Sequence, residues 1–222
     1  MQIALLGGSG DIGEGIGLRI ARDTSHDVVI GSRRREKAED AAASYRNTLA
    51  PNADDSRIVG ASNETAASEG DFVIVCVPPR YVLDTVQAVR SDLKDDTVVV
   101  SPCVRMSRNE TGFHYQSSEV GSVAEEISDV LPDQVPVVGA FQNLAAGALT
   151  DLDRDLDLDV VVTGDDDESK QKVTALLEGI EGLGTCDAGA LANSREVESL
   201  TPLLINLSMN NSDLHDLGVK FR

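Results

Sequence analysis

Three glycines near the N-terminus have the spacing of a turn that binds phosphate groups. Gly8 ends the apolar run "QIALLGG", and Gly10 lies just after it. Gly13 lies in the first turn of the amphipathic stretch that follows, "DIGEGIGLRIARD". In such a fingerprint the first glycine permits a tight turn, the second lets the backbone approach a pyrophosphate, and the third lets the helix pack on the strand. The free N–H groups at the start of the helix can then bind the phosphates. The spacing therefore predicts a dinucleotide site.

A cluster of polar and basic side chains follows the second apolar run, "DVVIGS": Ser32, Arg33, Arg34 and Lys37. A site for NAD places Asp or Glu here, to accept hydrogen bonds from the ribose 2′-hydroxyl. The planar fork of an arginine can instead pair with a 2′-phosphate, and Ser32 and Lys37 add a hydroxyl donor and a point charge. Cations at a helix start oppose the helix dipole by about 0.3–1 kcal/mol each, which a bound phosphate would offset. The cluster predicts NADP.

Ligands of parallel sheets bind outside the carboxyl ends of the strands. The segments that follow positions 77 and 101 should therefore line a cleft beside the nicotinamide. The candidates in these segments are Val77, Pro78, Tyr81 and Val104.

Short apolar runs alternate with helical stretches over the first 141 residues. Strands are expected at 2–8, 27–32, 57–62, 71–78, 96–102 and 135–141, and helices at 11–23, 35–49, 62–69, 80–94 and 119–131. This alternation predicts a Rossmann-type α/β fold with a doubly wound, mostly parallel sheet over residues 1–141.

Residues 142–222 are expected to form a smaller C-terminal α/β domain that closes over the cleft and supplies a dimer contact. Helices are predicted at 166–180 and 194–217 around a short strand at 183–189. Pro202 should kink the last helix. Residues 150–168, in which Asp alternates with Leu before a strand, are expected to form a solvated acidic edge, and no metal site is predicted.

The chain is strongly acidic, with 38 Asp and Glu against 19 Lys and Arg and a net charge of −19. It has 24 Asp, 14 Glu, 14 Arg, 5 Lys and no Trp. This composition resembles proteins of salt-loving archaea, in which molar salt shortens the Debye length to ~3 Å. An acidic protein from an ordinary organism is the alternative. Either way, a nucleic-acid partner is not expected, because phosphate backbones need a net basic face.

The cysteines and the apolar runs indicate in which cellular compartment the protein works. Cys76, Cys103 and Cys186 fit no zinc or disulfide spacing, and they are expected to be buried thiols in a reducing cytoplasm. No apolar run reaches the ~18 residues of a membrane span.

No nucleophile with a partner base is visible, so no catalytic residue is predicted. The three histidines, His26, His114 and His215, are scattered and fit no motif. A hydride passed between two cofactors needs positioning more than it needs a proton shuttle.

Several segments, in this order, resemble a known family: "ALLGGSGDIGEG", "VIGSRRREKAE", "VVVSPCV", "GDDDESK", "CDAGALANSREVESLTP" and "DLGVKF". The chain is similar along its whole length to archaeal NADPH-dependent reductases of the deazaflavin coenzyme F420. The resemblance implies a Rossmann domain that binds NADP and a small C-terminal domain that helps to form the deazaflavin pocket. It also implies hydride transfer between nicotinamide C4 and deazaflavin C5, in either direction. The dimer contact expected from the C-terminal region would make the protein a homodimer.

The same resemblance implies which residues contact the two cofactors. Contacts with NADP are expected at Ser9, Gly10, Asp11, Ile12, Ser32, Arg33, Lys37, Val77, Tyr81, Val104 and Ala146. Contacts with the deazaflavin are expected at Gln142, Asn143 and Leu217. The chain has Gln142 where the family member used for comparison has histidine. Glutamine can donate to a deazaflavin carbonyl, but it carries no titratable charge.

Two other functions fit the residues. One is an NADPH-dependent reductase of another small acceptor, such as a flavin, an imine or a ketone. The other is a non-catalytic module that senses NADP. A sensor would need no acceptor cleft, whereas residues 142–149 and 190–217 are predicted to close one.

Overall fold

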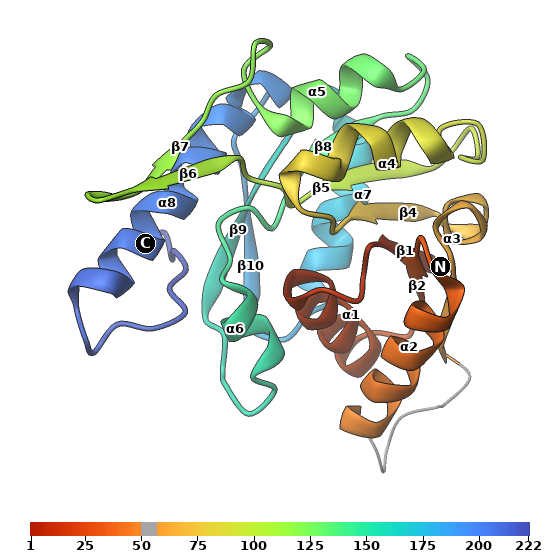
Figure 1. Cartoon of the computed structure of the whole chain (residues 1–222), viewed down its shortest axis with the longest axis horizontal. Coiled ribbons are helices and arrows are strands. Elements are labelled where there is room, and N and C mark those ends of the chain that lie inside the picture. The colour runs from red at the N-terminus through yellow and green to blue at the C-terminus, as the bar shows by residue number, and fades with distance from the viewer. Residues whose placement is uncertain (50–56) are drawn as a thin grey trace.

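The computed structural model describes residues 1–49 and 57–222 of the chain, and its central element is a mostly parallel sheet (Figure 1). The sheet contains eight strands: β1 (Gln2–Leu6), β2 (Asp27–Ser32), β3 (Ile58–Ser62), β4 (Phe72–Val75), β5 (Val98–Ser101), β8 (Val137–Gly139), β9 (Leu158–Gly164) and β10 (Leu183–Asp187). Their order across the sheet is β3-β2-β1-β4-β5-β8-β9-β10. The chain reverses its direction of winding between β1 and β4. The carboxyl ends of these two strands are where a ligand of such a sheet binds.

Helices cover both faces of the sheet: α1 (Asp11–Asp23), α2 (Arg35–Leu49), α3 (Asn63–Glu69), α4 (Val82–Val89), α5 (Val123–Val130), α6 (Ala146–Thr150), α7 (Asp167–Glu178) and α8 (Ser194–Asn210). Two short 3₁₀ turns, η2 (Pro79–Tyr81) and η3 (Leu191–Asn193), precede α4 and α8. Alternate side chains of β1 enter different cores, as the pleat requires. Ile3 and Leu5 pack with α1, α2, α6 and α7, whereas Ala4 and Leu6 pack with α3, α4 and α5.

The sheet continues across position 141. Strand β8 pairs with β9 in antiparallel orientation, and β9 pairs with β10 in parallel orientation. The strands of the predicted second domain therefore extend the first sheet. The division of labour between residues 1–141 and 142–222 stays a prediction.

A two-stranded hairpin, β6 (Met106–Asn109) and β7 (Gly112–Tyr115), was not predicted and packs on α8 (Figure 1). Asn206 of α8 accepts a hydrogen bond from the N–H of Phe113 (2.8 Å) and donates one to the carbonyl of Phe113 (2.7 Å). These bonds join β7 to α8 although the two are far apart in sequence.

Three expectations need correction. The last helix ends at Asn210, before the predicted end at 217, and it contains Pro202. Strand β9 is buried along its length. Its Asp159, predicted in a solvated edge, accepts hydrogen bonds from Lys220 Nζ (2.9 Å) and the N–H of Phe221 (2.8 Å). Cys186 is half-buried rather than buried, and all three cysteines are free thiols.

Within residues 1–49 and 57–222, no helix combines the length and apolar character that a transmembrane helix needs.

Candidate functional site

The glycine turn joins β1 to α1 and leaves open space at one of its three fingerprint glycines. A Cβ added to Gly8 would lie 2.6 Å from Leu5 Cβ, and one added to Gly13 would lie 2.6 Å from Gly8 Cα. A Cβ added to Gly10 would have Gly7 O, at 3.8 Å, as its only neighbour within 4 Å among the residues described. Gly8 and Gly13 are therefore required by packing, and Gly10 leaves room for a ligand.

The first turn of α1 is suited to bind an anion. Gly10 is the N-cap residue, and its lack of a side chain leaves the helix start without a side-chain cap. The N–H groups of this turn and the positive end of the helix dipole both favour a phosphate. Buried Tyr45 of α2 stabilises the glycine turn, because its hydroxyl donates a hydrogen bond to the carbonyl of Gly8 (2.7 Å). Burial raises the pKa of Tyr45, so the hydroxyl keeps its proton.

The basic cluster lies at the carboxyl end of β2. Ser32 is buried, and its Oγ accepts a hydrogen bond from the N–H of Arg34 (3.3 Å). Arg33, Arg34 and Lys37 are exposed. Among the residues described, no carboxylate forms an ion pair with any of these three cations.

Tyr81 joins this cluster from another strand of the sheet. It lies after β4, and the guanidinium carbon of Arg33 is 5.2 Å from the centre of its ring. Two residues predicted from separate parts of the sequence, Arg33 and Tyr81, are thus neighbours in the structure.

A cavity of about 490 Å³ opens at the carboxyl ends of the central strands. Seven of the residues predicted on the nucleotide side line it: Gly10, Asp11, Ile12, Val77, Pro78, Val104 and Ala146. The thiol of Cys103, also in its wall, donates to the carbonyl of Val75 (3.0 Å). Burial raises the pKa of Cys103, which therefore stays a neutral thiol. We call this space the nucleotide-side cavity.

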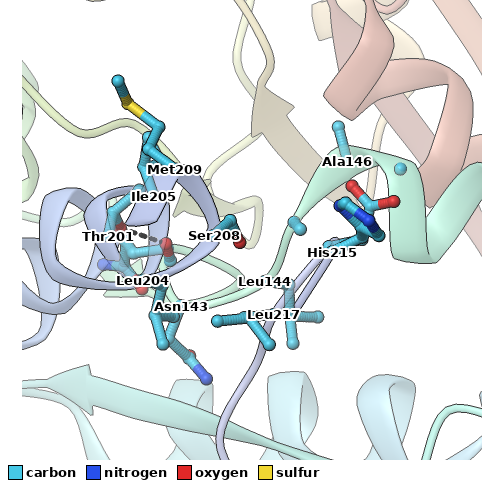
Figure 2. A pocket seen from close by; sticks show the side chains of 14 residues that line it. Asn143, Leu144, Ala146, Thr201, Leu204, Ile205, Ser208, Met209, His215 and Leu217 are labelled. Carbon is cyan, nitrogen blue, oxygen red and sulfur yellow. Dashed lines mark hydrogen bonds between the residues drawn. The ribbon is translucent and has the colours of Figure 1, made fainter. Parts of the chain in front are cut away.

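A second cavity, of about 610 Å³, lies between α8 and the segment before α6 (Figure 2). It is lined by Gln142, Asn143 and Leu217, the three residues predicted on the acceptor side. Asn143 uses its side chain internally, since its Nδ2 donates to the carbonyl of Asp159 (2.7 Å) and its Oδ1 accepts from the N–H of Val161 (3.1 Å). We call this space the acceptor-side cavity.

Four residues, here called the shared wall, line both cavities: Gln142, Leu144, Ala146 and Thr201. The chain enters this wall through Phe141, whose φ of 68° is unusual for a residue other than glycine. Thr201 Oγ1 of α8 donates to the carbonyl of Gln142 (2.5 Å; Figure 2).

The side chain of Gln142 has polar atoms without partners. It is 2% exposed, and neither its Nε2 nor its Oε1 has a hydrogen-bond partner in the part of the chain that the structure describes. A buried amide without partners is costly, at about 1–3 kcal/mol. A Cβ added to Gly139 would lie 2.6 Å from Gln142 Nε2, so the amide lies against the end of β8. It must turn toward the cavity before a bound ligand can supply the missing bonds.

The predicted residues thus fall into three groups. One group surrounds the nucleotide-side cavity and a second lines the acceptor-side cavity. Gly8, Ser9 and Gly13 in the glycine turn, and Ser32, Arg33, Arg34, Lys37 and Tyr81 near the end of β2, line neither cavity. In the described residues, no group of three His, Cys, Asp or Glu side chains is placed to hold a metal ion.

Comparison with known proteins identifies the family. Residues 2–105 match the family described as NADP oxidoreductase, coenzyme F420-dependent. The chain is 40% identical to the F420-dependent NADP reductase of Methanocaldococcus jannaschii, over 94% of this chain and 93% of the relative. It is 36% identical to the F420-dependent NADP reductase of Methanothermobacter marburgensis, over 99% of this chain and 97% of the relative. The chain belongs to the F420-dependent NADP reductase family.

Solved structures support the Rossmann-type fold of this F420-dependent NADP reductase family member. A crystal structure from Arthrobacter sp. FB24, assigned to an F420-dependent NADP reductase, aligns with a TM-score of 0.81 at 22% identity. The alignment covers 100% of this chain and 99% of the Arthrobacter chain. Arogenate dehydrogenase from Synechocystis aligns with a TM-score of 0.61 at 17% identity, over 85% of this chain and 60% of that one.

The sequence did not predict that one face of α8 would line the acceptor-side cavity of this family member. This face contributes Thr201, Leu204, Ile205, Ser208 and Met209 to the acceptor-side cavity. Their spacing of three and four residues is that of one helical face, which is the signal that could have identified them. His215, predicted to be structural or exposed, is exposed and also lines this cavity.

Proposed function

We propose that this chain catalyses hydride transfer between NADP(H) and the deazaflavin coenzyme F420. The observation that carries the proposal is the pair of cavities with a shared wall. One lies at the glycine turn, and the other lies under α8. Two flat rings bound one on each side of that wall would be close neighbours, as direct hydride transfer requires.

The residues at the nucleotide side fit NADP. Open space beside Gly10 and the uncapped start of α1 suit a pyrophosphate. Arg33, Arg34 and Lys37 have no carboxylate partners among the described residues, so a 2′-phosphate can bind there without displacing an ion pair. We assign Ser32, Arg33, Arg34 and Lys37 to the 2′-phosphate, and Val77 and Val104 to the wall beside the nicotinamide, where NADPH supplies the hydride when it is bound.

The residues at the acceptor side fit a flat ring with polar edges. The lining is largely apolar, from Leu144, Leu204 and Leu217 among others, and it would exclude water from the reacting faces. Once its buried amide turns from Gly139 toward the cavity, Gln142 can donate from Nε2 to a ring carbonyl and accept at Oε1 from a ring N–H. No side chain of the shared wall can exchange a proton near neutral pH. The protein therefore acts here by orienting the two rings.

The decisive experiment measures the absorbance of oxidised F420 with purified protein and NADPH, with flavin mononucleotide and a cyclic imine as alternative acceptors. Loss of F420 absorbance that depends on both protein and NADPH supports the proposal. Turnover with a flavin or an imine but not with F420 would favour a reductase of another acceptor. Tight NADPH binding with no turnover of any acceptor would favour a sensing module.

We further propose that residues 1–141 bind the nucleotide and that residues 142–222 complete the acceptor site within a homodimer. The outer face of α8 exposes Leu203 (53%) and Leu207 (40%), which is apolar area that a second copy could cover. Sedimentation equilibrium should give a dimer. Leu203→Asp combined with Leu207→Asp should give a monomer, whereas a monomeric wild type would contradict this proposal.

We also propose an archaeal, salt-adapted protein that works in the cytoplasm. The charge of −19 opposes compaction when it is unscreened, and free thiols are typical of reducing compartments. The melting temperature should rise between ~0.1 and ~3 M potassium chloride, as screening increases. A flat response over that interval would contradict salt adaptation.

A further inference from the structure

Arg80 lies beside the basic cluster, although no motif pointed to it. Its guanidinium carbon is 4.6 Å from the centre of the Tyr81 ring, and that of Arg33 is 5.2 Å from the same point. The two arginines are 47 positions apart in the sequence and come from the segments that follow β2 and β4. One aromatic ring thus brings together two cations at the predicted 2′-phosphate site.

The backbone that carries Arg80 is held in one conformation. Arg80 is the middle residue of η2 (Pro79–Tyr81), with Pro78 as its N-cap residue and Pro79 as its first residue. Two consecutive prolines fix their own φ angles, and each restricts the residue before it, so the backbone between β4 and Arg80 has few conformations open to it. The position of Arg80 relative to β4 is therefore set by the local sequence, before any ligand binds.

The charge arrangement around Tyr81 favours an anion. Two guanidinium groups near one ring repel each other, and the electron-rich faces of the ring offset only part of that repulsion. Neither Arg33 nor Arg80 forms an ion pair within the parts of the chain that the structure describes. Both are exposed, so their N–H donors can reach a ligand. A doubly charged phosphate between them would remove the repulsion and accept hydrogen bonds from both forks.

We propose that Arg80 is a specificity-determining residue for the adenosine 2′-phosphate of NADP, acting with Arg33 across the ring of Tyr81. This inference rests on the proposed function, because it takes the cluster after β2 as the 2′-phosphate site. Arg80 adds a donor fork from the β4 side of the sheet, opposite the donors of β2. The phosphate is then held from two strands rather than one.

The test compares two small probes that differ in the 2′-phosphate, adenosine 2′,5′-bisphosphate and 5′-AMP. Their dissociation constants are measured at one fixed salt concentration, by displacement of bound fluorescent NADPH. Arg80→Ala should weaken the bisphosphate about tenfold and leave 5′-AMP unchanged. Arg80→Lys should give an intermediate loss, because it keeps the charge without the fork.

Arg90→Ala is the matched control, since Arg90 is also exposed, is the C-cap residue of α4, the helix that follows η2, and its replacement changes the net charge equally. It should leave both probes unchanged. Equal losses for both probes in Arg80→Ala, or equal bisphosphate losses in Arg80→Ala and Arg90→Ala, would overturn the role of Arg80. If the wild type bound both probes equally, the NADP assignment itself would fail. A wild-type preference for the bisphosphate that is undiminished in Arg80→Ala would overturn only the inference about Arg80.

Discussion

The nucleotide-side and acceptor-side cavities meet at four residues, but the chain assembles them in different ways. The nucleotide side consists of strand ends and the turns that directly follow them, so a few consecutive residues, such as 8–13, make most of a subsite. The acceptor side has no such segment. It forms where α8, the segment 142–147 and the segment 215–217 come together (Figure 2).

The two sides also differ in the forces available to hold a ligand. Near the nucleotide side, exposed cations from two strand ends surround Tyr81. On the acceptor side the lining is mostly apolar, and the charged or titratable groups, His215 and Asp216, lie at the exposed segment that precedes Leu217. Binding of the nucleotide should therefore depend on charge and salt, and binding of the acceptor on shape.

Reversing the charge of Arg33 is the sharpest test of the electrostatic side. Arg33→Asp should cost on the order of 2–4 kcal/mol in NADP binding, because it removes a charge-assisted pair and adds repulsion. Titration with NADPH monitored by its fluorescence measures the loss. Arg35→Asp is the control, since Arg35 is a neighbour that already pairs with Glu39 (2.7 Å). A wild type that used NADH as efficiently as NADPH would contradict the role of the cluster.

The acceptor side depends on a buried carboxylate that anchors α8. Glu198 is fully buried, and it accepts hydrogen bonds from the N–H groups of Val123 (2.9 Å) and Ala124 (3.3 Å) at the start of α5. The hydroxyl of Tyr115 donates to its other oxygen (3.2 Å). Burial outweighs these bonds and raises the pKa of Glu198 to about 7.

A raised carboxyl pKa stabilises the fold at low pH. The folded state holds a proton that the unfolded state releases near pH 4.5, so this contribution to the free energy of unfolding falls as the pH rises from about 4.5 to about 7. The loss should be about 2–3 kcal/mol. Glu198→Gln mimics the protonated form and should remove this slope. Urea unfolding at several pH values measures it, and identical slopes in wild type and variant would show that Glu198 titrates normally.

The contrast between the two sides explains which parts of the site could be predicted from the sequence. The spacing of Gly8, Gly10 and Gly13 and the missing acid after β2 are local signals, and they predicted the nucleotide side from a few residues. Their meaning depends only on the strand–turn–helix unit that contains them. The parallel sheet followed for the same reason, since each buried strand is a short apolar run between turns.

The remaining features depend on contacts between distant segments. The hairpin β6–β7 has a polar sequence, "MSRNETGFHY", and it is stabilised by Asn206 from α8. The burial of Asp159 depends on Lys220, and the pairing of Arg33 with Tyr81 on the order of strands. The early end of α8 has a local cause that was overlooked, because Asn210, Asn211 and Ser212 favour helix ends over helix interiors. A single sequence shows none of the long-range pairs directly.

Enlarging the shared wall tests whether the two cavities work together. Ala146→Leu places a larger side chain between the two bound rings, which must otherwise approach to ~3–3.5 Å for transfer. Turnover should fall by about 10²-fold, since a displacement of about 1 Å can cost that much. Binding of adenosine 2′,5′-bisphosphate should not change, because it contacts the other end of the site. Leu204→Met, which nearly conserves volume in the acceptor-side lining away from the shared wall, is the control. Full activity of Ala146→Leu would place the transfer elsewhere.

The smallest expected effect comes from Gln142, a residue of the shared wall. Neither polar atom of its side chain has a hydrogen-bond partner among the described residues. Gln142→Ala should raise the KM for F420 about tenfold, the loss expected for one ring hydrogen bond of about 1.4 kcal/mol, and leave the KM for NADPH almost unchanged. It should introduce no new pH optimum, because neither glutamine nor alanine titrates.

Gln142→His completes the design, since histidine titrates near pH 6.5 and should make the KM for F420 depend on pH in that range. Steady-state kinetics with each cofactor varied in turn, from about pH 5.5 to 8.5, separate these outcomes. Equal rises in both KM values for Gln142→Ala would mean that the residue only supports the wall. A pH-independent Gln142→His variant would mean that the side chain does not reach the ring. Either result would remove the polar contact from the acceptor side and leave shape alone to position the deazaflavin.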